Sequence, residues 1–177
     1  MTYKKIFFNV SIFIIIVFVL VGCAKSRYLI YMSPTVNLKS FVNIEVSAIE
    51  LESQRLNVEI PTLYILRHEI IKAIQKSNMY QKVANEIDTY RGTLLIKCKI
   101  VEFDKGNRVL RYFIGMGAGK AYLKSICLFY NKENGQLIAT GTFSGEIESG
   151  FFGGSVDQNE MVGAIVKAIV LFLKKGV

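Results

Sequence analysis

The chain has 177 residues and a formal net charge of +8 at pH 7, and 51% of its residues are hydrophobic. This is one domain's worth of sequence, long enough for a real hydrophobic core. A single histidine and three cysteines without a Cys-x-x-Cys pair exclude the usual metal-ligand patterns. The basic residues are scattered, with no run of five or more, which indicates solubility and some attraction to anionic lipid headgroups.

The first 22 residues have the pattern of a secretory signal peptide. A lysine pair precedes an apolar run over residues 6–21, and the small residue Gly22 stands directly before Cys23. A membrane-spanning helix needs about 20 apolar residues. The run here is shorter, and Asn9 and Ser11 interrupt it. We therefore expect residues 1–22 to be removed.

The end of this segment, Leu20-Val21-Gly22-Cys23, resembles the bacterial lipobox. The resemblance implies that Cys23 becomes the first mature residue and carries a covalent lipid; no other cofactor is expected. One acyl chain binds a membrane reversibly, at about 0.8 kcal/mol per buried CH₂, so several chains should hold the protein permanently. Ala24 is not aspartate, which by the Gram-negative sorting rule implies the periplasmic side of the outer membrane. Nucleic acid is not an expected partner there.

Residues 23–35 are expected to form an acylated N-terminus and tether, followed by a single domain over residues 36–177. The tether is not rich in glycine or serine, so its Tyr28-Leu29-Ile30-Tyr31 stretch could also pack or pair. Fully extended, twelve residues reach roughly 40 Å at most.

Apolar spacing predicts four strands and a first helix. The strands cover residues 36–49, 93–103, 121–130 and 137–147, and a short extra strand is possible over 79–84. Pro61 opens an amphipathic helix that ends near Ser77-Asn78. Asn134-Gly135 predicts a hairpin with a type I′ turn, because both residues accept a positive φ.

The last predicted helix begins at Asp157, with Glu160 completing a capping box, and ends near Lys174. Residues 161–173 are apolar on almost every side. The helix is too short to span a bilayer, so we expect it to lie between the sheet and the first helix, or else to dock a partner. The elements together predict an α+β fold, with both helices on one face of a mostly antiparallel sheet of about four strands.

The two remaining cysteines face each other in the predicted hairpin. A hairpin centred between Tyr112 and Phe113 places Cys98 opposite Cys127, and a disulfide is allowed outside the reducing cytosol. We nevertheless favour two buried free thiols, since free cysteine is commonly buried.

The glycine-rich residues 115–120 do not fit a nucleotide-binding loop. The phosphate-loop pattern needs a glycine where Ile114 stands and a serine or threonine where Ala121 stands, and the dinucleotide fingerprint needs a glycine at Lys120.

The same region is similar to the signature of a bacterial lipoprotein family. The matching residues are Phe103-Asp104-Lys105-Gly106-Asn107-Arg108, Leu110-Arg111 and Gly115-Met116-Gly117-Ala118-Gly119. The family is known as domain of unknown function 4410. The resemblance extends from about Thr93 to the final helix, and it implies an envelope lipoprotein with no assigned activity.

Two glycine-rich segments, residues 108–119 and 150–154, are expected to share one end of the domain, which we call the glycine-loop pole. The hairpin connections bring both segments to the same end of the strand over residues 121–130. The candidate interaction residues are Arg108, Arg111, Tyr112, Phe113, Ile114, Met116, Phe151 and Phe152. Apolar side chains on glycine-rich loops are an expected contact with protein or membrane. The alternative is that they fold back and cap the core.

No catalytic constellation is found in the sequence. Acidic residues such as Glu102 and Glu146 lie on strands, no serine occupies a nucleophile elbow, and His68 lies on the outer flank of a helix. We therefore expect an interaction module, bound to the membrane by acyl chains, with an envelope protein or a second copy as partner. The alternative is a small-ligand or lipid carrier with an apolar pocket under the C-terminal helix.

Overall fold

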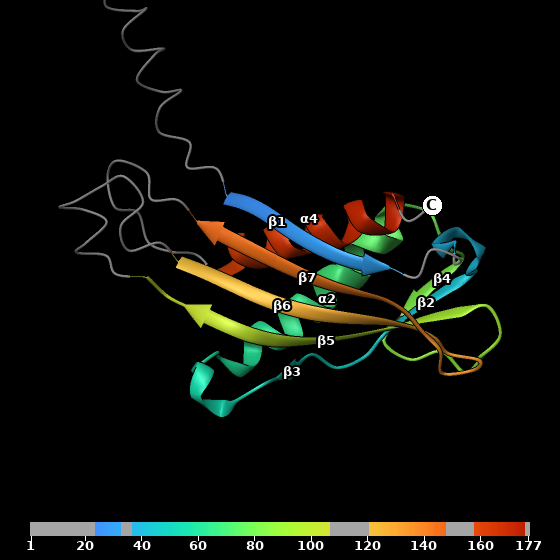
Figure 1. Cartoon of the computed structure of the whole chain (residues 1–177), viewed down its shortest axis with the longest axis horizontal. Coiled ribbons are helices and arrows are strands. Elements are labelled where there is room, and N and C mark those ends of the chain that lie inside the picture. The colour runs from blue at the N-terminus through green and yellow to red at the C-terminus, as the bar shows by residue number, and fades with distance from the viewer. Residues whose placement is uncertain (1–23, 33–36, 107–120, 148–157, 176–177) are drawn as a thin grey trace, which may run out of the picture.

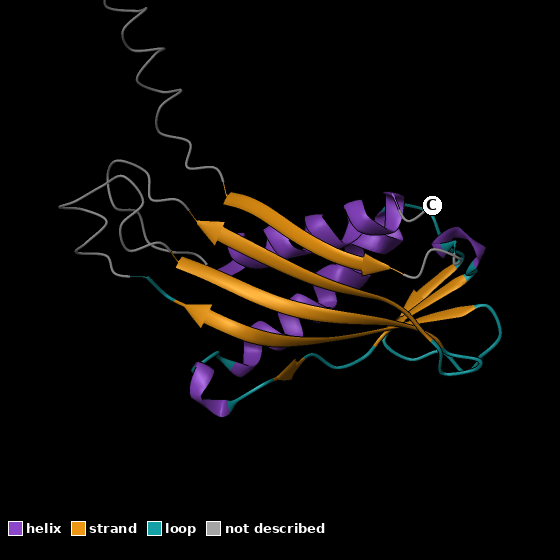
Figure 2. Ribbon diagram, viewed as in Figure 1, coloured by secondary structure: helices purple, strands orange, loops and turns teal. Residues whose placement is uncertain are grey.

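The computed structural model describes residues 24–32 by their backbone and residues 37–106, 121–147 and 158–175 in full. One sheet carries two helices on one face (Figures 1 and 2). The strands are β1 (Ala24–Met32), β2 (Asn43–Val46), β3 (Glu50–Leu51), β4 (Lys82–Ala84), β5 (Thr93–Asp104), β6 (Ala121–Asn131) and β7 (Leu137–Ile147). The helices are α2 (Ile60–Lys76) and α4 (Gln158–Lys175), with 3-10 turns η1 (Leu38–Ser40) and η2 (Gln54–Leu56).

The sheet is mixed, with the strand order β1-β7-β6-β5-β2-β4 and with β3 beside β5. Strands β1, β7, β6 and β5 pair antiparallel, whereas β2 pairs in parallel with both β4 and β5. The α+β class and the placement of both helices on one face are confirmed, but the prediction of about four mostly antiparallel strands is wrong. Strand β3 was missed, because its two residues are too few for an alternating pattern to be visible. Strand β4, with three residues, lies within the short extra strand considered over residues 79–84.

The strand predicted over residues 36–49 is shorter in the structure. The Asn37 side chain accepts a hydrogen bond from the backbone N–H of Lys39 at 2.8 Å and starts the turn η1. Such local side-chain bonds compete with a strand ladder, so the strand begins only at Asn43.

Residues Ala24–Met32, predicted as part of a tether, form the edge strand β1. Ala24 pairs with Ile147 and Met32 with Ala139, so β1 follows β7 over most of its length. This pairing satisfies backbone groups that β7 would otherwise leave open. The sheet therefore begins one residue after Cys23.

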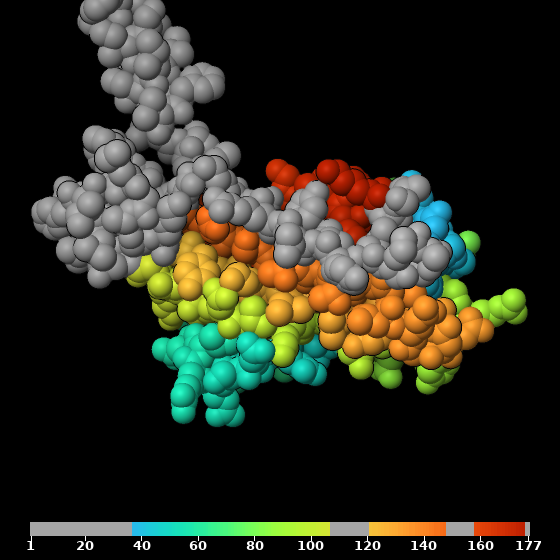
Figure 3. Space-filling view, viewed as in Figure 1, coloured from blue at the N-terminus to red at the C-terminus, as the bar shows by residue number. Residues whose placement is uncertain are grey.

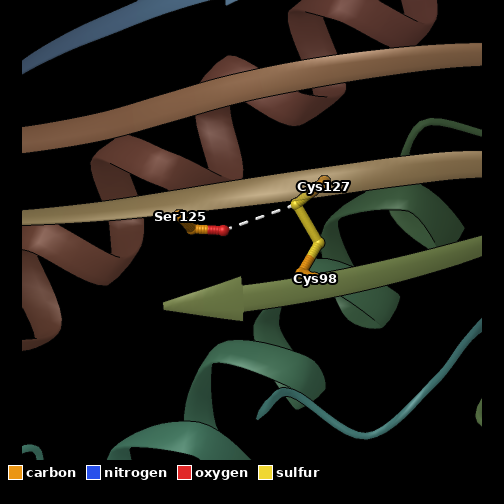
Figure 4. The surroundings of a disulfide bond; sticks show 3 residues. All are labelled: Cys98, Ser125 and Cys127. Atoms are coloured by element: carbon orange, nitrogen blue, oxygen red, sulfur yellow. Dashed lines mark hydrogen bonds between the residues drawn. A yellow bond between two sulfur atoms is a disulfide. The ribbon is translucent and has the colours of Figure 1, made fainter. Parts of the chain in front are cut away.

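The two cysteines form a disulfide, so the prediction of free thiols is wrong. Cys98 lies directly opposite Cys127 in the β5–β6 register, with an S–S distance of 1.99 Å and a Cα–Cα distance of 4.0 Å. Figure 4 shows the bond crossing between the two strands, with the Ser125 hydroxyl 3.4 Å from the Cys127 sulfur. The predicted register was right, and it is the register that brings the two sulfurs within bonding reach.

The β6–β7 hairpin has a longer turn than predicted. The N–H of Gly135 donates to the carbonyl of Asn131 at 2.8 Å, and Gly135 has a φ of 72°, whereas Asn134 is not in the positive-φ region. Asn134 instead accepts a hydrogen bond from the N–H of Gln136 through its side chain. That side-chain bond stabilises a wider turn than the predicted type I′ geometry.

Helix α4 packs directly on the sheet and beside α2. The predicted position between the sheet and α2 is not what the structure shows, because α2 makes its own contacts with β2 and β4. Helix α4 contacts β7, β1, β6 and α2, and nine of its side chains are buried. Lys167 and Lys174 lie on the exposed side. The opposite face of the sheet carries no described helix, and strands β5 and β6 lie at its surface (Figure 3). Within the described ranges, no helix is long and apolar enough to cross a membrane.

Two glycines provide a matched test of how closely α4 approaches β7. A Cβ at Gly145 would lie 2.3 Å from the backbone oxygen of Met161, whereas a Cβ at Gly163 would meet nothing within 4 Å. We expect Gly145→Ala to lower the free energy of unfolding by about 1–3 kcal/mol or more, because the helix backbone must move. Gly163→Ala should raise it by about 0.8–1 kcal/mol through helix propensity. Urea unfolding of both variants checks this, and changes of the same sign would contradict it.

Candidate interaction site at one end of the sheet

The residues predicted to carry function all lie outside the described part of the chain. They are Cys23, Arg108, Arg111, Tyr112, Phe113, Ile114, Met116, Phe151 and Phe152. Their roles therefore remain predictions. The structure does describe the strand ends from which their segments leave the sheet.

These strand ends converge, as the hairpin argument predicted. Asp104, the last residue of β5, pairs with Tyr122, and Ala121, the first residue of β6, pairs with Ile147 at the end of β7. Ile147 also pairs with Ala24. The two glycine-rich segments thus leave the sheet from neighbouring strand ends at the glycine-loop pole, and β1 begins at the same end with Ala24 (Figure 1).

Both helices also begin at this pole. The Thr62 hydroxyl donates to Gln158 Oε1 at 2.6 Å, which joins the first turns of α2 and α4. Lys105, just beyond β5, lies 3.5 Å from the carboxylate of Glu59 at the start of α2. Ile60, the first residue of α2, is 66% exposed. The described surface of this pole therefore includes an exposed apolar side chain.

The opposite end of the sheet, which we call the hairpin pole, consists of the loops over residues 85–92 and 132–136. Lys132 Nζ lies 2.7 Å from Glu45 Oε2, and each side chain is 13% exposed. Lys132 also donates to the carbonyl of Ile87, and its Nζ lies 4.5 Å from the centroid of the Tyr90 ring. The same Glu45 oxygen accepts from the N–H of Ile87 at 2.8 Å. The charges of Glu45 and Lys132 neutralise each other, and the backbone groups of Ile87 are hydrogen-bonded to both. We call this cluster the clamp and assign it a structural role.

An open groove of about 500 Å³ lies beside α2. Its lining residues are Tyr64, Arg67, His68, Ile71, Gln75, Val83, Ala84 and Asn85. Arg67 donates to the carbonyls of Val46 and Asn85 at 3.0 Å, and Gln75 donates to that of Val83 at 2.8 Å. These bonds join α2 to the ends of β2 and β4. The described residues contain no group of three side chains able to hold a metal ion.

The space under α4 is occupied by aromatic rings. The ring of Phe172 lies 4.9 Å from that of Phe129 and 6.2 Å from that of Phe143, measured between centroids. All three residues belong to the buried core. The described residues under this helix are therefore packed against one another at the place where the alternative prediction put an apolar pocket.

Among the described side chains, Tyr80 has a clearly shifted pKa. Burial raises the pKa of Tyr80 to about 12, because loss of water disfavours the phenolate. Its hydroxyl has no hydrogen-bond partner among the described residues. This phenol is therefore neutral near pH 7 and unsuited to proton transfer there.

Comparison with known proteins gives a family and a fold. A family model described as Domain of unknown function (DUF4410) matches residues 36–150. No curated protein matches the sequence.

Three solved structures are similar to this chain to different degrees. A PelC dodecamer from Paraburkholderia phytofirmans has a TM-score of 0.58 at 8% identity, covering 86% of this chain and 99% of that one. A DUF4136 family protein from Bacteroides thetaiotaomicron has a TM-score of 0.50 at 11% identity, covering 83% and 95%. Lipoprotein GNA1162 from Neisseria meningitidis has a TM-score of 0.46 at 11% identity, covering 76% and 99%.

Proposed function

The chain belongs to the family described as Domain of unknown function (DUF4410), and we propose that it is a lipid-anchored lipoprotein of the bacterial cell envelope whose single domain acts by binding. The observation that carries this proposal is the convergence of strand ends. Ala24 pairs with Ile147, and Ile147 pairs with Ala121. An anchor at Cys23 and both glycine-rich segments then belong to one end of the domain.

The disulfide supports a compartment outside the cytoplasm. Cytosolic thiols are kept reduced, and disulfides persist in the periplasm and at cell surfaces. The Cys98–Cys127 bond is therefore in keeping with export by the predicted signal peptide. With Ala24 after the acylated cysteine, we propose the periplasmic side of the outer membrane if the source is Gram-negative.

The contact surface that we propose is the set of candidate residues at the glycine-loop pole. Its partner is an envelope protein or a second copy of the chain. The similar fold of PelC is described as a dodecamer, which supports testing self-association first. The filled core under α4 supports binding at the surface over transport of a ligand inside.

Loss of the acylation site is expected to change the N-terminus of the protein. Cys23→Ser removes the thiol that would carry the diacylglyceryl group, so the variant should carry no lipid and keep residues 1–22 uncleaved. The apolar residues 6–21 would still hold this variant to membranes, so fractionation alone does not test the assignment. Ala24→Ser, one residue further on, keeps the thiol and should be cleaved and acylated like the wild type. Mass measurement of the N-terminus decides this, and a wild-type protein without lipid, or a Cys23→Ser variant processed like the wild type, would refute the lipoprotein assignment.

The contact surface has its own test. Phe151→Ser with Phe152→Ser should reduce crosslinked oligomers or partner complexes in intact cells, while changing stability by under about 0.5 kcal/mol if the rings are exposed. Tyr90→Ser, at an exposed aromatic position of the hairpin pole, is the control and should leave crosslinking unchanged. A loss of about 3 kcal/mol or more in the phenylalanine variant would indicate that the rings cap the core instead.

A further inference from the structure

We propose that the domain stands upright on the bilayer, with the end of the sheet marked by Ala24, Ala121 and Ile147 facing the lipid headgroups and the hairpin pole pointing away from the membrane. The inference rests on the proposed acylation of Cys23. It adds to the proposed function the orientation of the domain on the membrane, and it identifies the lipid headgroup layer as a surface that the domain contacts.

The first argument is the length of chain between the anchor and the sheet. Ala24 is held in the ladder with Ile147. Consecutive Cα atoms are 3.8 Å apart, so acyl chains on Cys23 begin one residue from the folded sheet. A free tether of twelve residues would have allowed a separation of roughly 40 Å. With β1 in place, this end of the domain must lie at the membrane surface.

The second argument is that three neighbouring strands and both helices begin or end at this end of the domain. Ala24, Ile147 and Ala121 occupy neighbouring positions across three strands, and α2 and α4 begin at the same end. Ile60 offers an exposed apolar side chain at this level, suited to the boundary between water and headgroups. Tyr130 is eight residues along β6 from Tyr122, about 27 Å at the rise of an antiparallel strand. An upright domain therefore holds the hairpin pole well clear of the headgroups.

The competing arrangement is a domain that lies on its side. A one-residue link limits distance but not tilt, and the uncovered sheet face also carries half-buried apolar residues such as Ile126 and Leu128. In that arrangement all positions along β6 would be at a similar depth. The two orientations therefore differ in the depth profile along a single strand.

The chain contains no tryptophan, so one introduced indole reports its own position. Tyr122→Trp and Tyr130→Trp replace half-buried tyrosines near opposite ends of β6. Each variant, in the acylated form that begins at Cys23, is placed in phosphatidylcholine–phosphatidylglycerol vesicles with a nitroxide on the lipid headgroup. We expect several-fold stronger fluorescence quenching at position 122 than at 130. Equal quenching, or stronger quenching at 130, would overturn the proposed orientation.

A second pair of tryptophan variants, at exposed positions, keeps the test valid if the variants in β6 do not fold. Ile60→Trp at the glycine-loop pole and Tyr90→Trp at the hairpin pole replace side chains that are 66% and 61% exposed, and the same difference in quenching is expected. Vesicle flotation separates the two proposals. Protein that fails to float with the vesicles refutes the anchoring and with it the orientation. Protein that floats but is quenched equally at both ends refutes the orientation alone.

Discussion

Replacing Lys132 by methionine is expected to lower the free energy of unfolding by about 3–5 kcal/mol. The ammonium group lies 2.7 Å from Glu45 Oε2, and both side chains are 13% exposed. Methionine fills much of the same space but leaves the mostly buried Glu45 carboxylate without a counter-charge. The carbonyl of Ile87 loses a donor as well. Urea unfolding near neutral pH measures the loss.

An exposed ion pair on the same sheet provides the control. Lys99 and Glu52 are 2.9 Å apart, but their side chains are 44% and 49% exposed. Lys99→Met should therefore cost less than about 1 kcal/mol. The double variant Glu45→Gln with Lys132→Met should recover part of the loss, because no charge then remains buried. Equal losses for Lys132→Met and Lys99→Met would show that Glu45 and Lys132 are screened by solvent.

This clamp joins parts of the sheet that sequence analysis could not connect. Glu45 belongs to β2 in the parallel part, and Lys132 follows β6 in the antiparallel part, 87 residues further along the chain. Nothing local to either residue indicates the other. Their pairing depends on β5, which lies between the two parts and pairs with both.

Long elements were predictable because each contains several periods of its pattern. Residues 93–103 alternate over most of their length, and the structure extends this strand by one residue, to Asp104. Strand β2, with four residues, alternates too briefly to be placed within the longer predicted segment. The stretch Tyr28-Leu29-Ile30-Tyr31 is rich in residues that favour strands but does not alternate. Its composition allowed pairing, yet only the structure shows that β7 is its neighbour.

The candidate site was predictable to the extent that hairpins fix which strand ends are neighbours. That argument placed residues 108–119 and 150–154 at one end of the domain, and the pairing of Ala121 with Ile147 agrees. It could not place Ala24 there, because an edge strand joins its sheet through long-range pairing. The spacing of the two cysteines predicted that Cys98 lies opposite Cys127. It could not predict whether the two thiols are oxidised to a disulfide, because that depends on the cellular compartment.

Loss of the Cys98–Cys127 bond is the second large effect that we expect. The bond closes a loop with a sequence separation of 29, and the chain-entropy relation gives about 3.5 kcal/mol for a loop of this size. Cys98→Ala with Cys127→Ala should lower the free energy of unfolding by about that amount. Mass measurement without reductant should show two hydrogens fewer than two free thiols would give.

The reduced wild-type chain is the control that separates the covalent bond from packing. Cys98 and Cys127 are 3% and 0% exposed, so the alanine variant also loses buried sulfur atoms, whereas reduction after unfolding keeps them. If the bond acts mainly by restricting the unfolded chain, the reduced protein should be destabilised nearly as much as the alanine variant. If the reduced and oxidised proteins unfold at the same urea concentration, the bond contributes little, and the hairpin register alone holds β5 against β6. Because both sulfurs are buried, we also expect reductant to act at a rate set by unfolding, which native-state reduction over time would measure.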